Sequence, residues 1–207
     1  MRQGSVRRGI LRFFRGVMRL VTRPRITWLD PTARELLNGG AVMVCNHNSA
    51  TNGLMLPAAF RKDLVPVVAK DWYEKPQWHA WLEAYGCVPV DRYGLDTQWV
   101  RLAAGAIREG RTVLIFPEGR VRKDDVLNEF KPGFALLAAM TGAPVIPVSI
   151  CGRYTPLKPA RLVVGSPVRL ERSGAMRSEY LTGQSALLRE TVAENKQKWK
   201  RSKDQHE

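Results

Sequence analysis

The sequence predicts an α/β protein with a single domain, in which a mixed, mostly parallel sheet is flanked by helices and preceded by a basic amphipathic N-terminal helix. The chain has 207 residues, enough for one sizeable core, and its 44% apolar and 25% charged residues are typical of a globular protein. Short apolar runs of the strand type alternate with segments of helical periodicity. The first 25 residues hold eight arginines and no acidic residue.

Residues 1–25 are predicted to form a helix with one apolar and one basic face, on a spacing of ~100° per residue. The apolar face holds Val6, Ile10, Phe13, Phe14, Val17, Leu20 and Val21, and the basic face holds Arg8, Arg12, Arg15, Arg19 and Arg23. Two interpretations are open: a helix that docks its apolar face on the core and leaves a solvated arginine face, or an interfacial helix in anionic lipid with Phe13 and Phe14 in the acyl boundary. The acid-free polar face favours lipid. We therefore divide the chain into a membrane-associating arm, residues 1–25, and a domain over residues 26–207.

Helices and strands are predicted to alternate through the rest of the chain. Asp30 and Pro31 provide an N-cap and a first helical position for a short helix that ends near Gly40. Strands are predicted at about 41–45, 64–68, 87–90, 112–116, 143–150 and 161–164. Further helices are predicted from a cap at Ser49 or Thr51 to about residue 60, and over 76–85, 96–109, 132–140 and 178–199.

The net charge of +14 favours an anionic partner, such as a phosphate-bearing substrate, an acidic protein, an anionic lipid surface or nucleic acid. We expect no nucleic acid, because the chain has no base-reading motif. Cys45, Cys87 and Cys151 lack metal-ligand spacing, so we expect reduced core thiols, no metal site and a cytosolic compartment. No apolar run approaches the ~20 residues of a spanning helix, and no secretory signal is evident. These observations predict peripheral binding at the cytoplasmic face of a membrane.

Polar clusters follow four of the predicted strands. They are Asn46-His47, Lys70, Asp91-Arg92 and Glu118-Gly119-Arg120. Ligands of an open α/β sheet bind outside the carboxyl ends of its strands, so neighbouring strands would bring these clusters to one rim. His47 is the side chain there most able to move a proton near neutral pH. The rim suits an anionic substrate from which a proton must be removed.

These motifs resemble the glycerolipid acyltransferase family of the lysophosphatidic acid acyltransferase type. The family's first motif, Asn-His-x-Ser-x-x-Asp, is matched by residues 46–52 except at the last position. Its second, a Gly followed by a short apolar run and an Arg, is matched by residues 86–92, and its third, Phe-Pro-Glu-Gly with nearby basic residues, by residues 116–120. A subsequent Phe-Lys-x-Gly is matched at 130–133, and the fourth motif, an apolar run with an internal proline, at 143–148. Four motifs in order make the resemblance specific.

The resemblance implies acyl transfer from acyl-CoA or acyl carrier protein to a hydroxyl of a lysophospholipid or a glycerol phosphate, without a cofactor. His47 is the implied general base, which takes the proton of the acceptor hydroxyl so that its oxygen attacks the thioester directly. The implied substrate-binding residues are Lys70, Arg92, Glu118, Gly119 and Arg120. The three cations would hold the acceptor phosphate, and Glu118 would orient the acceptor or a neighbouring cation.

Position 52 departs from the family motif, because Asn52 stands where the family has the aspartate that orients the histidine. An asparagine oxygen can accept the imidazole N–H, but the amide supplies no charge to an imidazolium. In the serine-protease triad the analogous exchange lowers turnover about 10⁴-fold. Three explanations are open: a natural variant with a slower or differently supported base, a weakened or inactive relative that binds lipid or acyl carrier, and a sequence altered to disable catalysis.

Overall fold

The fold is built on a mixed sheet. A computed structural model of the chain describes residues 2–92, 97–121, 126–156, 158–173 and 177–204, without the side chains of 2–8, 10 and 202–204. The described strands are β1 (Arg25–Trp28), β2 (Val42–Cys45), β3 (Val65–Ala69), β4 (Val88–Val90), β5 (Val113–Ile115), β6 (Val145–Cys151) and β7 (Arg161–Val164). They form a sheet in the order β1-β7-β6-β2-β5-β3-β4, in which β6 and β7 pair antiparallel and the other neighbours pair parallel.

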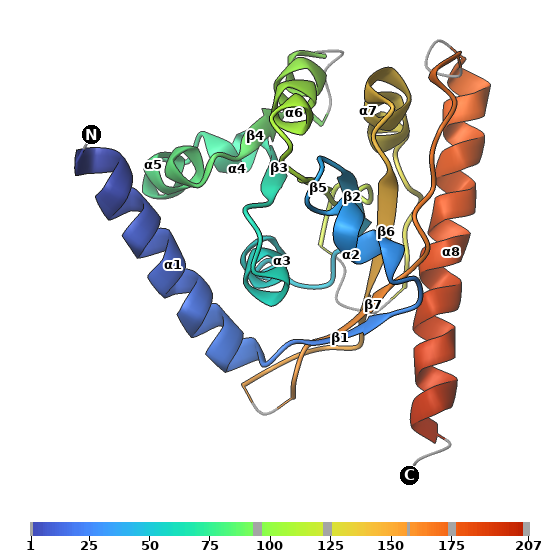
Figure 1. Ribbon diagram of the computed structural model, residues 1–207, viewed down its shortest axis with the longest axis horizontal. Helices are drawn as coiled ribbons and strands as arrows, with labels where there is room; N and C mark the ends of the chain where they lie inside the picture. Colours follow the sequence, from blue (N-terminus) through green and yellow to red (C-terminus); the bar gives the residue numbers. More distant parts are fainter. Residues whose placement is uncertain (1, 93–96, 122–125, 157, 174–176, 205–207) are drawn as a thin grey trace.

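Helices cover both faces of this sheet (Figure 1). They are α1 (Arg2–Thr22), α2 (Thr32–Leu36), α3 (Asn52–Phe60), α4 (Lys70–Tyr73), α5 (Pro76–Tyr85), α6 (Gln98–Arg108), α7 (Gly133–Thr141) and α8 (Ser178–Asp204). Alternate residues of β2 face opposite layers: Val42 and Val44 pack with side chains of α6, α7 and α8, whereas Met43 and Cys45 pack with those of α2 and α3. A central strand buried on both faces needs such a continuous apolar run. The predicted single-domain α/β fold is therefore confirmed.

The parallel strands bring four chain segments to one edge of the sheet. Val44 is in register with Ile115 of β5, and Cys45 with Val148 of β6. On the other side of β5, β3 and β4 run in the same direction. The residues that follow β2, β3, β4 and β5 therefore leave the sheet at its carboxyl edge, as the sequence predicted for the four polar clusters.

Several local predictions differ from the structure. β1 was not predicted, because its four residues gain their strand pairing from β7, more than 130 positions later, with Trp28 in register with Val164. The predicted side-chain cap of α3 by Ser49 or Thr51 is wrong, since Thr51 is the N-cap residue but makes no capping hydrogen bond. The helix predicted from Asp96 begins at Gln98 in the structure, and Asp96 itself lies outside the described residues.

Helix α1 docks on the domain through its arginines. Arg19 Nη1 donates to the carbonyl oxygens of Ala58 and Ala59, at 3.3 and 3.0 Å. These carbonyls belong to the last turn of α3, where helical N–H partners are missing. Arg15 forms an ion pair with Asp63, just beyond the same end of α3. The interpretation in which α1 places its apolar face on the core and its arginines in solvent is therefore wrong.

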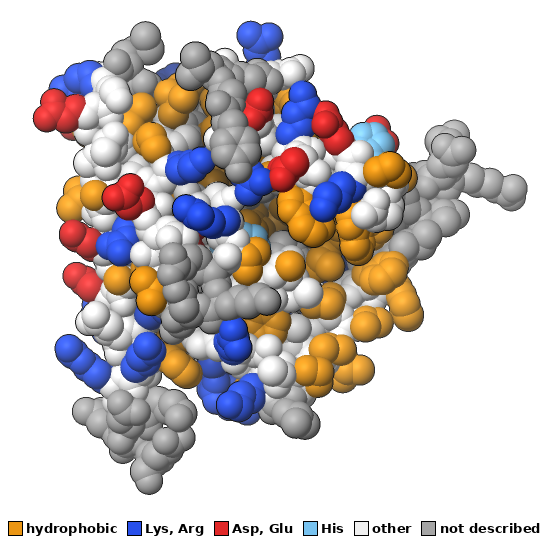
Figure 2. Space-filling model, turned by 180° about the vertical axis from the view of Figure 1, so that it is seen from behind, with side chains coloured by type: hydrophobic (Ala, Val, Ile, Leu, Met, Phe, Trp, Pro, Cys, Tyr) orange, Lys and Arg blue, Asp and Glu red, His pale blue; other side chains and the backbone are white. Residues whose placement is uncertain are grey.

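The apolar face of α1 consequently points away from the sheet. Phe13 is 68% exposed and Leu20 is 77% exposed. Phe14, Val17 and Val21 are exposed as well. Figure 2 shows apolar side chains gathered along this side of the molecule, over α1 and over α4 and α5, whose Trp72 and Trp78 are exposed. Among the helices that the structure describes, none combines the length and the apolarity needed to cross a membrane.

Candidate active site

The turn between β2 and α3 fixes the tautomer of His47. Its Nδ1 lies 3.0 Å from Oδ1 of Asn52. That oxygen also accepts the backbone N–H groups of Asn48, at 3.0 Å, and Ser49, at 2.9 Å. Because two backbone donors require an acceptor at this position, the proton of a neutral His47 lies on Nδ1. Nε2 is left with a lone pair that can accept a proton. We call residues 46–52 the catalytic turn, because they contain the general base that the family resemblance implies.

The surroundings of His47 favour its neutral form. The ring stacks on Phe116, with centroids 4.1 Å apart and an interplanar angle of 15°. Burial lowers the pKa of His47 below its ordinary value, and the hydrogen bond with Asn52 opposes this shift by raising the pKa. Neutral imidazole is the form that acts as a general base, so the site keeps His47 ready to accept a proton at neutral pH.

Glu118 holds the catalytic turn in place. Its side chain is buried, its Oε1 accepts the backbone N–H of His47 at 2.8 Å, and its Oε2 accepts that of Asn128 at 3.0 Å. The sequence suggested that Glu118 orients the acceptor or a neighbouring cation. In the structure each carboxylate oxygen instead bonds a backbone group, so Glu118 positions His47 relative to the segment after β5.

The substitution Glu118→Gln tests this positioning role. An amide NH₂ would meet one of the two backbone N–H groups, leaving a buried donor without its acceptor. We expect the free energy of unfolding to fall by ~1–3 kcal/mol. Urea denaturation measures it, and Glu129→Gln on the exposed side of the same loop is the matched control. Equal stability of the two variants would contradict the assignment.

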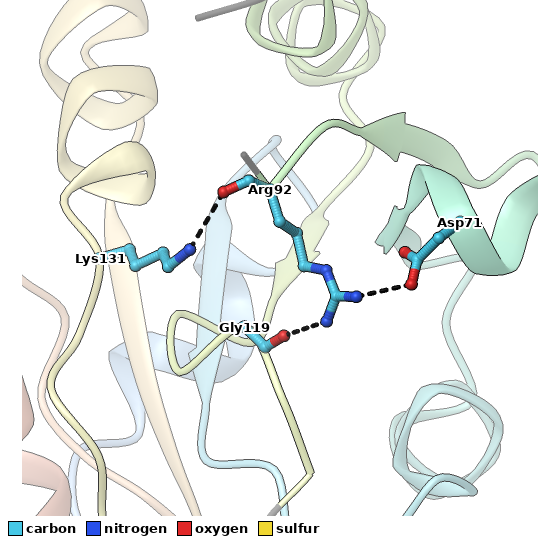
Figure 3. Close-up of polar contacts among 4 residues, drawn as sticks. All are labelled: Asp71, Arg92, Gly119 and Lys131. Atoms are coloured by element: carbon cyan, nitrogen blue, oxygen red, sulfur yellow. Dashed lines mark hydrogen bonds and ion pairs between the residues drawn. The ribbon is translucent and has the colours of Figure 1, made fainter. Parts of the chain in front are cut away.

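Arg92 connects α4 to the turn after β5 (Figure 3). Its Nη1 donates to the carbonyl oxygen of Gly119 at 2.8 Å, and its Nη2 lies 2.6 Å from Oδ2 of Asp71. Lys131 Nζ donates to the carbonyl oxygen of Arg92 at 3.3 Å. Gly119 directly follows Glu118, so hydrogen bonds link Arg92 to the catalytic turn.

The other predicted cations lie at the surface. Lys70 is the first residue of α4, is exposed, and has its Nζ 3.7 Å from Oε1 of Glu74. Arg120 is exposed beside Gly119. The hydrogen bonds therefore bring together His47, Asn52, Glu118, Gly119 and Arg92, and they do not include Lys70 or Arg120 among the contacts described.

Sequence reasoning missed three side chains of the site. Asn48 lies inside the first motif, Asp71 contacts Arg92, and the hydroxyl of Tyr154 lies 3.0 Å from Nδ2 of Asn52. Tyr154 comes shortly after β6, another parallel strand that ends at the same edge. A search for polar side chains after the carboxyl end of β6, as after the other strands, would have found it.

Neither a metal nor a cysteine nucleophile is indicated at this edge. Within the described ranges, no group of three or more His, Cys, Asp or Glu side chains is placed to hold a metal ion. Cys45, one residue before Asn46, is buried, and burial raises the pKa of its thiol well above the ordinary value. A protonated thiol is a poor nucleophile, so Cys45 is not indicated as one.

Comparison with protein families identifies one match over most of the chain. The model of the family described as Acyltransferase matches residues 13–151. This range begins within α1, ends with β6 and includes the catalytic turn, Arg92 and Glu118.

Several individual relatives are 1-acyl-sn-glycerol-3-phosphate acyltransferases. A chloroplastic 1-acyl-sn-glycerol-3-phosphate acyltransferase of Brassica napus is 36% identical over 32% of this chain and 20% of its own length. The Cocos nucifera enzyme of that description is 26% identical over 58% of this chain and 40% of its own length. A probable 1-acyl-sn-glycerol-3-phosphate acyltransferase of Mycoplasma genitalium is 32% identical over 54% of this chain and 44% of its own length. The chain thus spans less than half the length of each of these relatives.

A solved structure shares the fold. The crystal structure of the 1-acyl-sn-glycerophosphate acyltransferase PlsC from Thermotoga maritima has a TM-score of 0.63 to this chain at 21% identity. The match covers 94% of this chain and 83% of that one. It therefore extends beyond the motif-bearing part to the helices at both ends.

Proposed function

Because the chain belongs to the Acyltransferase family, we propose that it moves a fatty acyl group from an acyl thioester to a hydroxyl of a lysophospholipid or glycerol phosphate, with His47 as general base. The hydrogen bond between His47 Nδ1 and Asn52 Oδ1 is the observation that supports this proposal most directly, because it leaves Nε2 as the proton acceptor. Acyl-CoA or acyl carrier protein is the donor substrate, and the reaction needs no cofactor.

In the proposed reaction His47 alone takes up the proton and gives it back. Nε2 takes the proton of the acceptor hydroxyl, and the oxygen attacks the thioester carbonyl carbon. When the tetrahedral intermediate collapses, the carbon–sulfur bond breaks and the thiolate takes the proton from the imidazolium. An ester and a free thiol result, without a covalent enzyme intermediate. Asn52 orients the ring throughout but contributes no charge to the imidazolium.

We assign the acceptor phosphate to Arg92. Its guanidinium is linked to the catalytic turn through Gly119 and Glu118, and its Nη2 contacts the Asp71 carboxylate. A partly exposed ion pair is weak, so a phosphate dianion can replace the Asp71 carboxylate. Lys70, Gly119 and Arg120 complete the proposed acceptor site around it.

Removing the charge of Arg92 should weaken acceptor binding. Charge-assisted hydrogen bonds contribute ~1.5–3 kcal/mol, so Arg92→Gln is expected to raise KM for lysophosphatidic acid about 10- to 100-fold. Steady-state kinetics measures it, with Arg101→Gln on the exposed side of α6 as the matched control. A KM that follows the control would remove Arg92 from the acceptor site.

We place the protein at the cytoplasmic face of a membrane as a peripheral protein. Residues 1–25 would lie on an anionic lipid surface, residues 26–207 would form the catalytic domain, and no nucleic acid is bound. The exposed apolar face of α1, together with the net charge of +14, supports this arrangement.

The pH profile should show the lowered pKa of His47. The base is active when deprotonated, so kcat/KM rises with pH through the pKa of His47 in the free enzyme and then becomes constant. Burial lowers that pKa, so the midpoint of this rise should lie below the ordinary value of about 6.5. Initial rates between about pH 4.5 and 8 measure it. An acidic limb centred above 6.5 would contradict the environment assigned to His47.

The decisive assay compares donors. Acyl transfer to lysophosphatidic acid in anionic vesicles is measured with acyl-CoA and with acyl carrier protein. Turnover with either donor supports the proposal. Asn52 favours one alternative, a weakened or inactive relative that binds lipid or acyl carrier, and binding without turnover for any donor would establish that alternative instead.

A further inference from the structure

We propose that Asn48 is a positioning residue that holds position 52 as a neutral amide, so that the catalytic turn is built for asparagine rather than weakened by it. The first part of the argument concerns Asn52 itself, which is fully buried. Its Oδ1 accepts three N–H groups of the catalytic turn. Its Nδ2 donates to Oδ1 of Asn48 at 3.3 Å and to the hydroxyl of Tyr154 at 3.0 Å. The hydrogen-bonding capacity of this amide is completely used.

A backbone carbonyl fixes the direction of these bonds. Nδ2 of Asn48 donates to the carbonyl oxygen of Gly152 at 2.9 Å. A carbonyl can only accept, so the oxygen of the Asn48 amide must point the other way, toward position 52. Position 52 therefore needs a donor on that side and an acceptor on the side of His47. Asparagine offers both, whereas an ionised aspartate offers acceptors only.

Tyr154 plays a different part, because a hydroxyl can either donate or accept. In the structure it accepts from Nδ2 of Asn52 and lies 2.8 Å from the hydroxyl of Thr51. Facing a carboxylate, it could turn and donate. Asn48, held by Gly152, cannot adapt in this way. An aspartate at position 52 would thus place a carboxylate oxygen against the Asn48 oxygen in a buried setting, where unpaired acceptors are costly.

This arrangement also bears on catalysis, and that consequence rests on the proposed function. An amide orients the ring of His47 and fixes its tautomer without adding the negative charge that would favour an imidazolium. The base then remains deprotonated at lower pH than it would beside a carboxylate. The residue that matches asparagine at 52 is thus Asn48, from the catalytic turn, whereas Tyr154, from the loop after β6, can bond either an amide or a carboxylate.

A double-mutant cycle tests the inference without requiring turnover. Unfolding is measured in urea for the parent chain, Asn52→Asp, Asn48→Ala and the double variant. We expect Asn52→Asp to destabilise the parent chain. The cost is the factor by which Asn52→Asp raises the unfolding equilibrium constant. We expect this factor to be about tenfold smaller when Asn48 is alanine. An Asn52→Asp cost that is absent, or that is unchanged by Asn48→Ala, would overturn the proposal. Asn48→Ser replaces Asn48→Ala if the latter does not fold.

Two further measurements complete the test. In a Tyr154→Phe background the cost of Asn52→Asp should not shrink, because the hydroxyl that could donate to the carboxylate is gone; a smaller cost there would contradict the role of Tyr154. Nitrogen-15 NMR of His47 should show the Nδ1–H tautomer in the parent chain and a higher His47 pKa in Asn52→Asp. A protonated Nε2 in the neutral parent would overturn the proposal. Absence of acyl transfer would count against the proposed function and leave these outcomes intact.

Discussion

Replacing His47 by alanine is expected to lower kcat for acyl transfer ~10²–10⁴-fold, because the acceptor hydroxyl loses its general base. The loss should appear in kcat more than in KM, since the phosphate contacts assigned to Arg92 do not involve His47. Initial rates with lysophosphatidic acid and a saturating acyl donor measure this effect. His79→Ala is the matched control, because His79 is an exposed histidine of α5 whose Nδ1 contacts the carbonyl oxygen of Tyr73.

The fold should survive this substitution. Asn52 Oδ1 keeps its two backbone donors, and Glu118 still accepts the N–H of residue 47, since both contacts involve the main chain. The variant should therefore give an unaltered circular dichroism spectrum. Equal turnover in His47→Ala and the parent protein would exclude His47 as the base, and a rate loss as large in His79→Ala would show that the effect is not local.

The central strands of the sheet could be predicted because patterns in the local sequence define them. β2 is a run of apolar residues bounded by Gly40 and Asn46, and both of its faces are buried as such a run requires. β1 could not be predicted in the same way. Its four residues, of which Thr27 and Arg25 are exposed, become a strand only by pairing with β7. That pairing depends on tertiary contacts that no local pattern contains.

The two faces of α1 were predicted correctly, and the face that meets the domain was left open, with the lipid interpretation favoured. Periodicity separates Phe13 from Arg19 by face and says nothing about the neighbour. The outcome depends on the open carbonyls at the end of α3 and on Asp63, which attract Arg19 and Arg15. A solvated arginine face belonged to the docking interpretation, because charges are usually solvated. Here backbone oxygens and a carboxylate take the place of water.

The site was predicted by position more successfully than by role. Glu118 and Arg92 follow strands whose carboxyl ends meet, and this placed both at the correct edge. Their partners were not evident, because a carboxylate that accepts backbone N–H groups looks identical in sequence to one that faces a substrate. Asn48 is the clearest case: the role proposed for it follows from the direction of the Gly152 carbonyl, which only the folded chain defines.

Replacing Phe13 and Phe14 together by serine is expected to weaken binding to anionic vesicles about 10²-fold. Both rings are exposed on α1, and moving an aromatic side chain from water into the acyl boundary contributes at least ~1.4 kcal/mol each, a factor of about ten. Vesicle sedimentation with increasing fractions of anionic lipid measures the change. Leu187→Ser on α8 is the matched control, because Leu187 is exposed and apolar but lies on a helix that packs against another part of the sheet.

The serine variants should leave folding intact, since α1 is held by Arg15 and Arg19 on its other face. Activity on monomeric, short-chain acceptors should then be retained while activity on vesicles falls with binding. This pattern separates membrane attachment from catalysis. Undiminished vesicle binding would show that the exposed apolar face is not the lipid contact.

Arg19→Met gives the converse test, because it keeps the apolar face but removes the donors to Ala58 and Ala59. It should weaken the attachment of α1 to α3, lower stability, and leave vesicle binding largely unchanged.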